Sequence, residues 1–250
     1  MPNVLLAAHR AGPRGGVPVV FLGSLASDRS MWDPQVERLA PTTDVIVVEL
    51  PGHGASPLPP RGSTVADFAA QVLDTLDELG VRACHLVGLS LGGAVAQWLA
   101  AHARERVVTL TLLCTATRFG DPDMWCERAA LARAEGTGTL ATAVVGRWFT
   151  AAGPELVERM RAMVTAMSGE AYARSCEALA VWDGAELLPE ITAPTMVLAG
   201  AQDPSTPPEL LVGIAEAIPN STLHVLDPGA HLVNIERAGE VCELIAAHTR

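Results

Sequence analysis

The sequence is poor in cysteine, in positive charge and in long apolar runs, and each shortage excludes a class of protein. The cysteines number five in 250 residues, an odd and widely spaced set without a C-x-x-C pair. Disulfide frameworks and structural zinc sites need closer, paired spacings. We therefore expect reduced thiols at Cys84, Cys114, Cys126, Cys176 and Cys242.

Positive charge is scarce as well. Seventeen lysines and arginines stand against 28 aspartates and glutamates, which gives a formal net charge of −11. A chain of this charge repels nucleic acid and anionic membrane surfaces, so we expect neither as a partner. No two of the histidines are spaced as a metal-binding pair, and we expect no metal site.

Apolar stretches stay well short of the roughly 20 residues that a bilayer-crossing helix requires. The N-terminal segment MPNVLLAAHRAGPRGG has only a short apolar run and no clear signal-peptide pattern. Together with the cysteine pattern, these features predict a cytoplasmic protein. Internal repeats and the phosphate-binding pattern G-x-x-x-x-G-K-[ST] are also missing from the sequence.

What the sequence does contain is an alternation of short apolar runs and helical patterns. Its length and its 49% of hydrophobic residues suit one domain with a large core. Continuous apolar runs bounded by Gly or Pro are typical of parallel strands that are covered on both faces. We predict strands at Val17–Leu22, Val45–Glu49, Cys84–Gly88, Val107–Leu113, Thr195–Ala199 and Thr222–Leu226. Helices are predicted over 64–79, 91–103 and 207–218. The pattern predicts an α/β fold with a mostly parallel central sheet and helices on both faces.

The segment 119–188 interrupts this alternation. It contains helix-forming tracts and most of the aromatic residues, and none of it has a strand pattern. We interpret it as a helical insertion that forms a lid over the strand ends, because ligand pockets need large apolar walls. The alternative is an extra helical layer of the core. The predicted division is therefore a core of residues 1–118 and 189–250 and a lid of residues 119–188.

The motif that carries chemistry is Gly88-Leu89-Ser90-Leu91-Gly92, which matches G-x-S-x-G. An apolar strand precedes it and a helix follows it, as a nucleophile elbow requires. Ser90 then stands on a bend so tight that only glycine fits two positions to either side. The alternatives are a glycine-rich turn that only packs a helix on a sheet, or a dinucleotide loop. The second is disfavoured because GLSLGG does not match G-x-G-x-x-G.

A serine hydroxyl needs a base to take its proton. His231 follows the strand Thr222–Leu226, and Asp203 follows the strand Thr195–Ala199. Both therefore fall at the edge where active-site loops of a parallel sheet gather, and they give the order Ser…Asp…His. We predict His231 as the base and Asp203 as the residue that orients it, in preference to Asp227 and Asp183.

An oxyanion formed at the attacked carbonyl needs two backbone N–H donors. The amide of Leu91, directly after the nucleophile, supplies the first. The second should come from the loop after an early strand, Gly23-Ser24-Leu25-Ala26, where we assign the amide of Leu25.

These motifs together give the sequence a resemblance to the α/β-hydrolases over essentially its whole length. The residues that carry the resemblance are FLGSLASDRSMWDPQ, ELPGHGASPLP, HLVGLSLGGAVAQWLA, LAGAQDPSTPP and PGAHLVNIE, in that order. Within the superfamily it is most similar to the 3-oxoadipate enol-lactonases, above all in the insertion tract MWCERAALARAEGTGTLATAVVGRWFT. Two features depart from the pattern: Gly23 replaces a frequent Asn, and Glu49-Leu50-Pro51 replaces Asp-x-Arg.

The resemblance implies a serine hydrolase that opens a small enol-lactone in the β-ketoadipate pathway of aromatic catabolism, without a cofactor. Such a substrate carries a carboxylate, which needs a local cation in so acidic a protein. We predict Arg133 for this contact, with Arg118, Arg128 and Arg147 as alternatives, and Trp125 and Trp148 as pocket walls. A homo-oligomer is left open. The alternative functions are a general carboxylesterase, thioesterase or carbon–carbon bond hydrolase, or a ligand-binding receptor with slow turnover.

Overall fold

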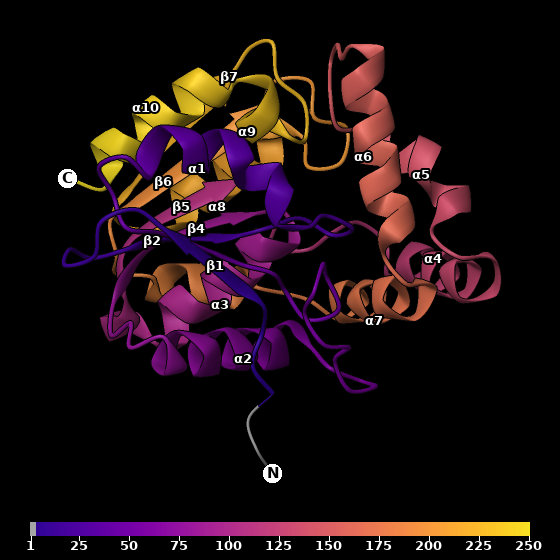
Figure 1. Ribbon diagram of the computed structural model, residues 1–250, viewed down its shortest axis with the longest axis horizontal. Coiled ribbons are helices and arrows are strands. Elements are labelled where there is room, and N and C mark those ends of the chain that lie inside the picture. Colours follow the sequence, from indigo (N-terminus) through magenta and orange to yellow (C-terminus); the bar gives the residue numbers. More distant parts are fainter. Residues whose placement is uncertain (1–3) are drawn as a thin grey trace.

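A computed structural model describes residues 4–250 as a seven-stranded sheet with helices on both faces (Figure 1). The first three residues of the predicted core segment 1–118 lie outside the described residues. The strands are β1 (Ala8–Ala11), β2 (Val19–Leu22), β3 (Val45–Val48), β4 (Cys84–Leu89), β5 (Val107–Leu113), β6 (Thr195–Gly200) and β7 (Ser221–Leu226).

The strand order is β1-β3-β2-β4-β5-β6-β7, with β1 antiparallel to β3 and every other neighbouring pair parallel. Every residue of β2, β3 and β6 is buried. Burial on both faces is what a parallel sheet between two helical layers requires, and it explains why these strands are continuous apolar runs.

Two layers of helices enclose the sheet. α1 packs against α10 on one face, α2 packs against α3 on the other, and α8 joins the second layer through η3 (Figure 1). The α-helices are α1 (Asp33–Leu39), α2 (Val65–Glu78), α3 (Leu91–His102), α4 (Pro122–Glu135), α5 (Gly138–Val145), α6 (Pro154–Ala166), α7 (Gly169–Ala180), α8 (Pro208–Ala217), α9 (Val233–Glu236) and α10 (Ala238–His248). The 3₁₀ helices are η1 (Arg29–Trp32), η2 (Arg104–Arg106) and η3 (Ala185–Glu190).

The predicted fold class is confirmed, and each predicted strand and helix is present within two residues of its expected ends. Thr64 closes a capping box with Asp67 at the start of α2, as its position before an apolar pattern indicates. Strand β1 was not predicted. It is four residues long, at the edge of the sheet and partly exposed, so it carries no continuous apolar run.

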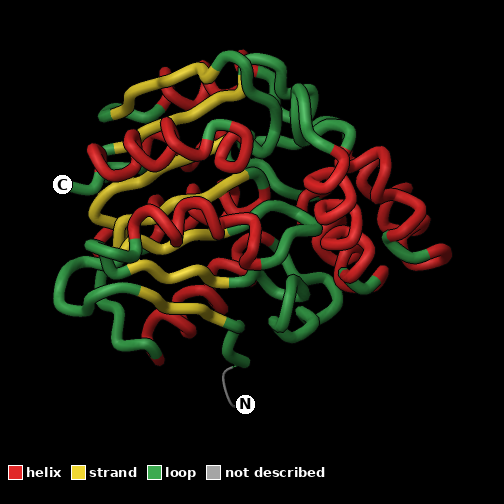
Figure 2. Tube along the Cα trace, turned by 45° about the horizontal axis from the view of Figure 1, so that its top comes forward, coloured by secondary structure: helices red, strands yellow, loops and turns green. Residues whose placement is uncertain are grey.

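The segment between β5 and β6 forms helices α4 to α7 and then η3, and contains no strand within the described residues. Figures 1 and 2 show α4 to α7 gathered at the end of the sheet rather than stacked on either face. Within this group, α4 packs on α7 and α5 packs on α6. The group stands where the carboxyl ends of the parallel strands point, which is where ligands bind in open α/β sheets.

All five cysteines are free, and only Cys126 is exposed. Among residues 4–250, no helix combines the length and the apolarity that a membrane span needs.

Candidate active site

Ser90 occupies the bend between β4 and α3, with φ at +56° and ψ at −115°. This backbone conformation is strained for a residue with a side chain. The bend is closed so tightly that a Cβ atom on Gly88 would lie 2.3 Å from the carbonyl oxygen of Gly92. A Cβ atom on Gly92 would lie 2.3 Å from the carbonyl oxygen of Leu22 on β2. Glycine at both positions is therefore a steric requirement of the bend.

His231 and Asp203 lie side by side on loops that leave the carboxyl ends of β7 and β6. The Nδ1 atom of His231 is 2.7 Å from Oδ2 of Asp203, and both residues are buried. Since an ionised carboxylate can only accept, this contact fixes the proton of the neutral imidazole on Nδ1 and leaves Nε2 free to act as a base.

The Asp203 carboxylate is saturated with donors. Oδ2 also accepts from the Thr206 hydroxyl at 2.6 Å, and Oδ1 accepts from the amides of Ser205 and Thr206 at 2.8 and 3.2 Å. Burial alone would raise the pKa of Asp203, but the charge and hydrogen bond of His231 and the other donors outweigh it and lower the pKa. The carboxylate is therefore ionised at neutral pH.

The rival carboxylates lie elsewhere. Asp227 is exposed and accepts a hydrogen bond from Gln202 at 2.8 Å. Asp183 is exposed and faces Arg118 at 3.5 Å. Among the described residues, Asp203 is thus the carboxylate that the structure brings to His231.

A cavity of about 510 Å³ opens between the strand ends and helices α4, α5 and α7. Its volume is in the range of small-molecule sites. Ser90 and His231 both line it, although no hydrogen bond joins their side chains within the described residues. Such contacts are often long or misaligned in a ligand-free enzyme and tighten when substrate binds.

The two predicted oxyanion donors have different surroundings. Leu91 is the first residue of α3, where helix amides have no partner inside the helix. Leu25 lines the cavity beside Ser90. The loop that carries Leu25 is joined to the start of α3, because the Gly92 amide donates to the Gly23 carbonyl at 3.0 Å.

Both predicted aromatic walls, Trp125 and Trp148, line the cavity. The indole of Trp125 donates to the carbonyl of Phe119. The carbonyl of Trp148 accepts from the amide of Leu232 at 3.0 Å, which ties the helical segment to the residue after His231. Glu236 adds to this link, since its carboxylate accepts from the amides of Thr150 and Ala230, both at 2.8 Å.

Arg133 does not lie at the cavity. Its guanidinium binds Glu170 and Glu177 at 2.7 and 2.6 Å, so its charge is already paired away from the site. The cations that line the cavity are Arg128 and Arg147, and no aspartate or glutamate of residues 4–250 lines it. Arg128 lies 4.8 Å above the Trp125 ring and 5.6 Å above the Tyr172 ring, and it donates to the Tyr172 hydroxyl.

Thr206 and Glu236 are two residues around the site that the sequence analysis did not single out. Thr206 stands three residues after Asp203, a spacing at which a hydroxyl and an amide turn back onto an aspartate. That pattern was a usable signal. No sequence pattern indicates a role for Glu236, because its partners Thr150 and Ala151 come from a distant segment.

Comparisons with known proteins identify the family of the chain. The family model of the alpha/beta hydrolase fold matches residues 17–238. 3-oxoadipate enol-lactonase 2 of Acinetobacter baylyi is 35% identical over 88% of this chain and 83% of its own length. 3-oxoadipate enol-lactonase 1 of the same organism is 30% identical over 98% of this chain and 93% of its own.

Among solved structures, the enol-lactonase from Burkholderia xenovorans LB400 is 34% identical with a TM-score of 0.93, covering 97% of this chain and 95% of its own. A family model that spans most of the chain and relatives of this identity settle the family. The chain belongs to the α/β-hydrolases and is an enzyme of their carboxylic ester hydrolase class.

Proposed function

We propose that Ser90, His231 and Asp203 form the catalytic triad of a serine hydrolase that opens a small enol-lactone. The observation that carries the proposal is the hydrogen bond between His231 and Asp203 at the wall of the cavity that Ser90 also lines. The strained, glycine-flanked bend at Ser90 supports it, because such strain persists where the surrounding structure holds a functional side chain in place.

The proposed reaction begins when the Ser90 oxygen attacks the lactone carbonyl and its proton passes to Nε2 of His231. The amides of Leu25 and Leu91 stabilise the oxyanion of the tetrahedral intermediate. The ring C–O bond then breaks, and His231 returns the proton to the leaving enol oxygen. Water, activated by His231, hydrolyses the acyl-enzyme, and the enol becomes a ketone. The chemistry uses no metal or organic cofactor.

In this proposal helices α4 to α7 act as the lid of the site, so that residues 119–188 are the lid and residues 1–118 and 189–250 the core. The position of these helices at the strand ends supports this assignment (Figure 1). So does the lining of the cavity, which takes Trp125, Arg128 and Trp148 from the lid and Ser90 and His231 from the core.

The proposed substrate is 3-oxoadipate enol-lactone, a small lactone with a free carboxylate. The names of both Acinetobacter relatives and of the Burkholderia structure support a lactone. Within residues 4–250, the cavity lining contains arginine and no carboxylate, which supports an anion. The product would then be 3-oxoadipate, an intermediate of aromatic catabolism in the β-ketoadipate pathway.

The direct test is a comparison of freshly generated enol-lactone with p-nitrophenyl acetate as substrates of the purified protein. We expect kcat/KM for the lactone to exceed that for the acetate by at least about 100-fold, because only the lactone gains contacts with the lid in the transition state. A ratio of this size corresponds to about 2.7 kcal/mol. Activity on the acetate alone would favour the general esterase instead. A protein that is neither active nor labelled by a fluorophosphonate is not a serine hydrolase.

Arg128 is the residue that we propose for the substrate carboxylate, in place of Arg133. Aromatic rings hold its guanidinium in position, which lowers the entropy cost of binding an anion. Replacing Arg128 with Gln should raise KM for the lactone by about 10- to 100-fold, the effect of losing a charged hydrogen bond. The value of kcat should change by less than about threefold.

Two controls accompany this variant. The neutral p-nitrophenyl acetate should keep its KM in Arg128→Gln, which separates lost charge from damaged lid packing. Arg133→Gln, on the same helix but paired with Glu170 and Glu177, should leave KM for the lactone unchanged. If Arg133→Gln has the larger effect on KM, the carboxylate is bound elsewhere.

A further inference from the structure

The loop after β2 holds the Leu25 amide between two anchored neighbours. The Ser24 amide donates to the sulfur of Met31 at 3.3 Å, and the Ala26 amide donates to Nε2 of His53 at 3.3 Å. Ala26 has φ at +65°, a left-handed conformation that an alanine does not favour by itself. Within the loop, the Ser24 carbonyl, which shares a peptide plane with the Leu25 amide, accepts from the amide and the hydroxyl of Ser27 at 3.2 and 2.7 Å. The orientation of the Leu25 amide therefore depends on Ser27 within the loop and on Met31 and His53 outside it.

The hydrogen bonds of His53 define its tautomer. Nδ1 lies 3.1 Å from the carbonyl oxygen of Pro51, which can only accept, so the proton is on Nδ1. Nε2 must then accept, and the Ala26 amide is its donor. His53 is thus a neutral imidazole that joins the loop after β3 to the loop after β2.

The loop that carries His53 is itself firmly held. The Glu49 carboxylate accepts from the amides of Ala55 and Arg29, both at 2.9 Å. A Cβ atom on Gly54 would lie 1.9 Å from Oε1 of Glu49, so only glycine permits this approach. Ser56 closes the loop, since its hydroxyl donates to the Glu49 carbonyl at 2.6 Å. The motif ELPGHGAS therefore builds a rigid support for the imidazole.

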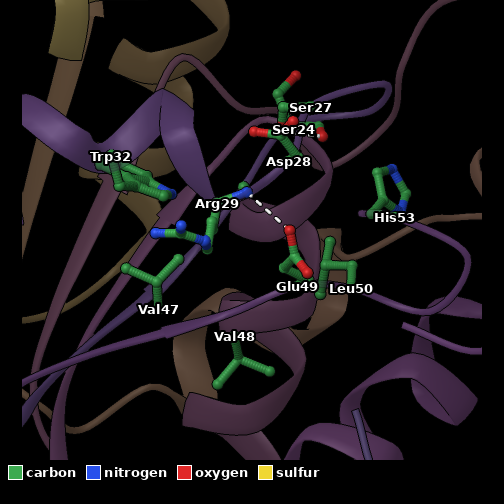
Figure 3. A pocket seen from close by; sticks show the side chains of 11 residues that line it. Ser24, Ser27, Asp28, Arg29, Trp32, Val47, Val48, Glu49, Leu50 and His53 are labelled. Atoms are coloured by element: carbon green, nitrogen blue, oxygen red, sulfur yellow. Dashed lines mark hydrogen bonds between the residues drawn. The ribbon is translucent and has the colours of Figure 1, made fainter. Parts of the chain in front are cut away.

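Burial keeps the imidazole in this state. His53 is 2% exposed, and desolvation lowers its pKa to about 4. The charged side chains that line the same small pocket are Asp28, Arg29 and Glu49. Figure 3 shows His53 at one side of this pocket and Trp32 at the other, with the Arg29 amide bonded to Glu49 between them. At neutral pH, Nε2 of His53 thus remains available to the Ala26 amide.

We propose that His53 is a positioning residue, which sets the Leu25 amide for oxyanion binding through its hydrogen bond from Ala26. This inference rests on the proposed serine hydrolase, but not on the lactone as substrate. It gives the motif ELPGHGAS a role in the reaction, although none of its side chains lines the catalytic cavity.

Three variants separate the two hydrogen bonds of His53. Glutamine can place an acceptor where Nε2 stands, asparagine reaches only as far as Nδ1, and leucine offers neither. The assay measures kcat and KM for p-nitrophenyl acetate, with kcat expressed per active site titrated by a fluorophosphonate. We expect His53→Asn and His53→Leu to lower kcat by about 10- to 100-fold with KM within about threefold, because a misplaced oxyanion donor weakens only the transition state.

His53→Gln should recover most of the lost kcat. His85→Gln is the matched control, since His85 lies on β4 and bonds Thr109 at 3.0 Å, outside the site. The kcat of this control variant should equal that of the wild type.

A purely structural role of His53 would reduce the titrated fraction and the melting temperature while kcat per active site stayed unchanged, which would overturn the inference. Equal loss in the Gln and Asn variants would also overturn it. A wild-type protein without esterase activity or labelling would overturn both this inference and the proposed triad.

Discussion

Replacing Ser90 with alanine is expected to lower kcat by about five to six orders of magnitude, because the members of a triad act as a unit. Without the hydroxyl, the pair of His231 and Asp203 has no nucleophile to activate. The measurements are kcat for the lactone and for p-nitrophenyl acetate, together with fluorophosphonate labelling, which should vanish.

The variant Ser90→Gly separates the loss of the hydroxyl from the release of backbone strain. The backbone strain at φ +56° costs about 1–3 kcal/mol for a residue with a side chain, whereas glycine adopts such angles freely. The glycine variant should therefore be as inactive as the alanine variant but unfold at a higher temperature. Ser205→Ala removes another hydroxyl from the cavity wall and should keep kcat within about threefold. Labelling that persists in Ser90→Ala would place the nucleophile on a different residue.

The central sheet could be predicted because its residues carry the signal locally. Strands such as β2 and β6 are buried on both faces, so their sequences are continuous apolar runs bounded by turn residues. The edge strand β1 lacks this property and was missed. The elbow at Ser90 and the loop positions of Asp203 and His231 followed from motif and topology, since parallel strands bring their carboxyl ends to one edge.

The substrate contacts could not be predicted equally well, because they depend on which face of a helix meets the cavity. Arg128 and Arg133 both lie on α4, but only Arg128 shares a face with Trp125, three residues away. That spacing was a usable signal once Trp125 had been assigned to the pocket. Arg133 instead pairs with Glu170 and Glu177 of α7, away from the cavity.

The role of His53 could not be predicted from the sequence for a different reason. The imidazole bonds to the backbone carbonyl of Pro51 and to the backbone amide of Ala26, and Ala26 lies in a separate loop. Backbone hydrogen bonds between loops leave no residue-type pattern in a single sequence. The glycines on either side of His53 mark a tight turn, but which amide its imidazole meets depends on how two loops pack at the end of the sheet.

Replacing Asp203 with asparagine is expected to lower kcat by about three to four orders of magnitude while the fold is kept. Asparagine Oδ1 can still accept from the amides of Ser205 and Thr206. Its NH₂ group then faces Nδ1 of His231 and the Thr206 hydroxyl, and donates where the carboxylate accepted. The imidazole responds by carrying its proton on Nε2, the atom that must take the proton of Ser90.

This outcome distinguishes tautomer control from simple packing, because the substitution preserves size and can preserve each neighbouring hydrogen bond. Asp227→Asn is the matched control: the same exchange at an exposed carboxylate near His231 in sequence should leave kcat within about twofold. The readouts are kcat, the rate of fluorophosphonate labelling and the melting temperature. Labelling should slow together with kcat, since both need Ser90 deprotonated. A nearly neutral Asp203→Asn, or an equal loss in Asp227→Asn, would refute the assignment of Asp203 as the acid that orients His231.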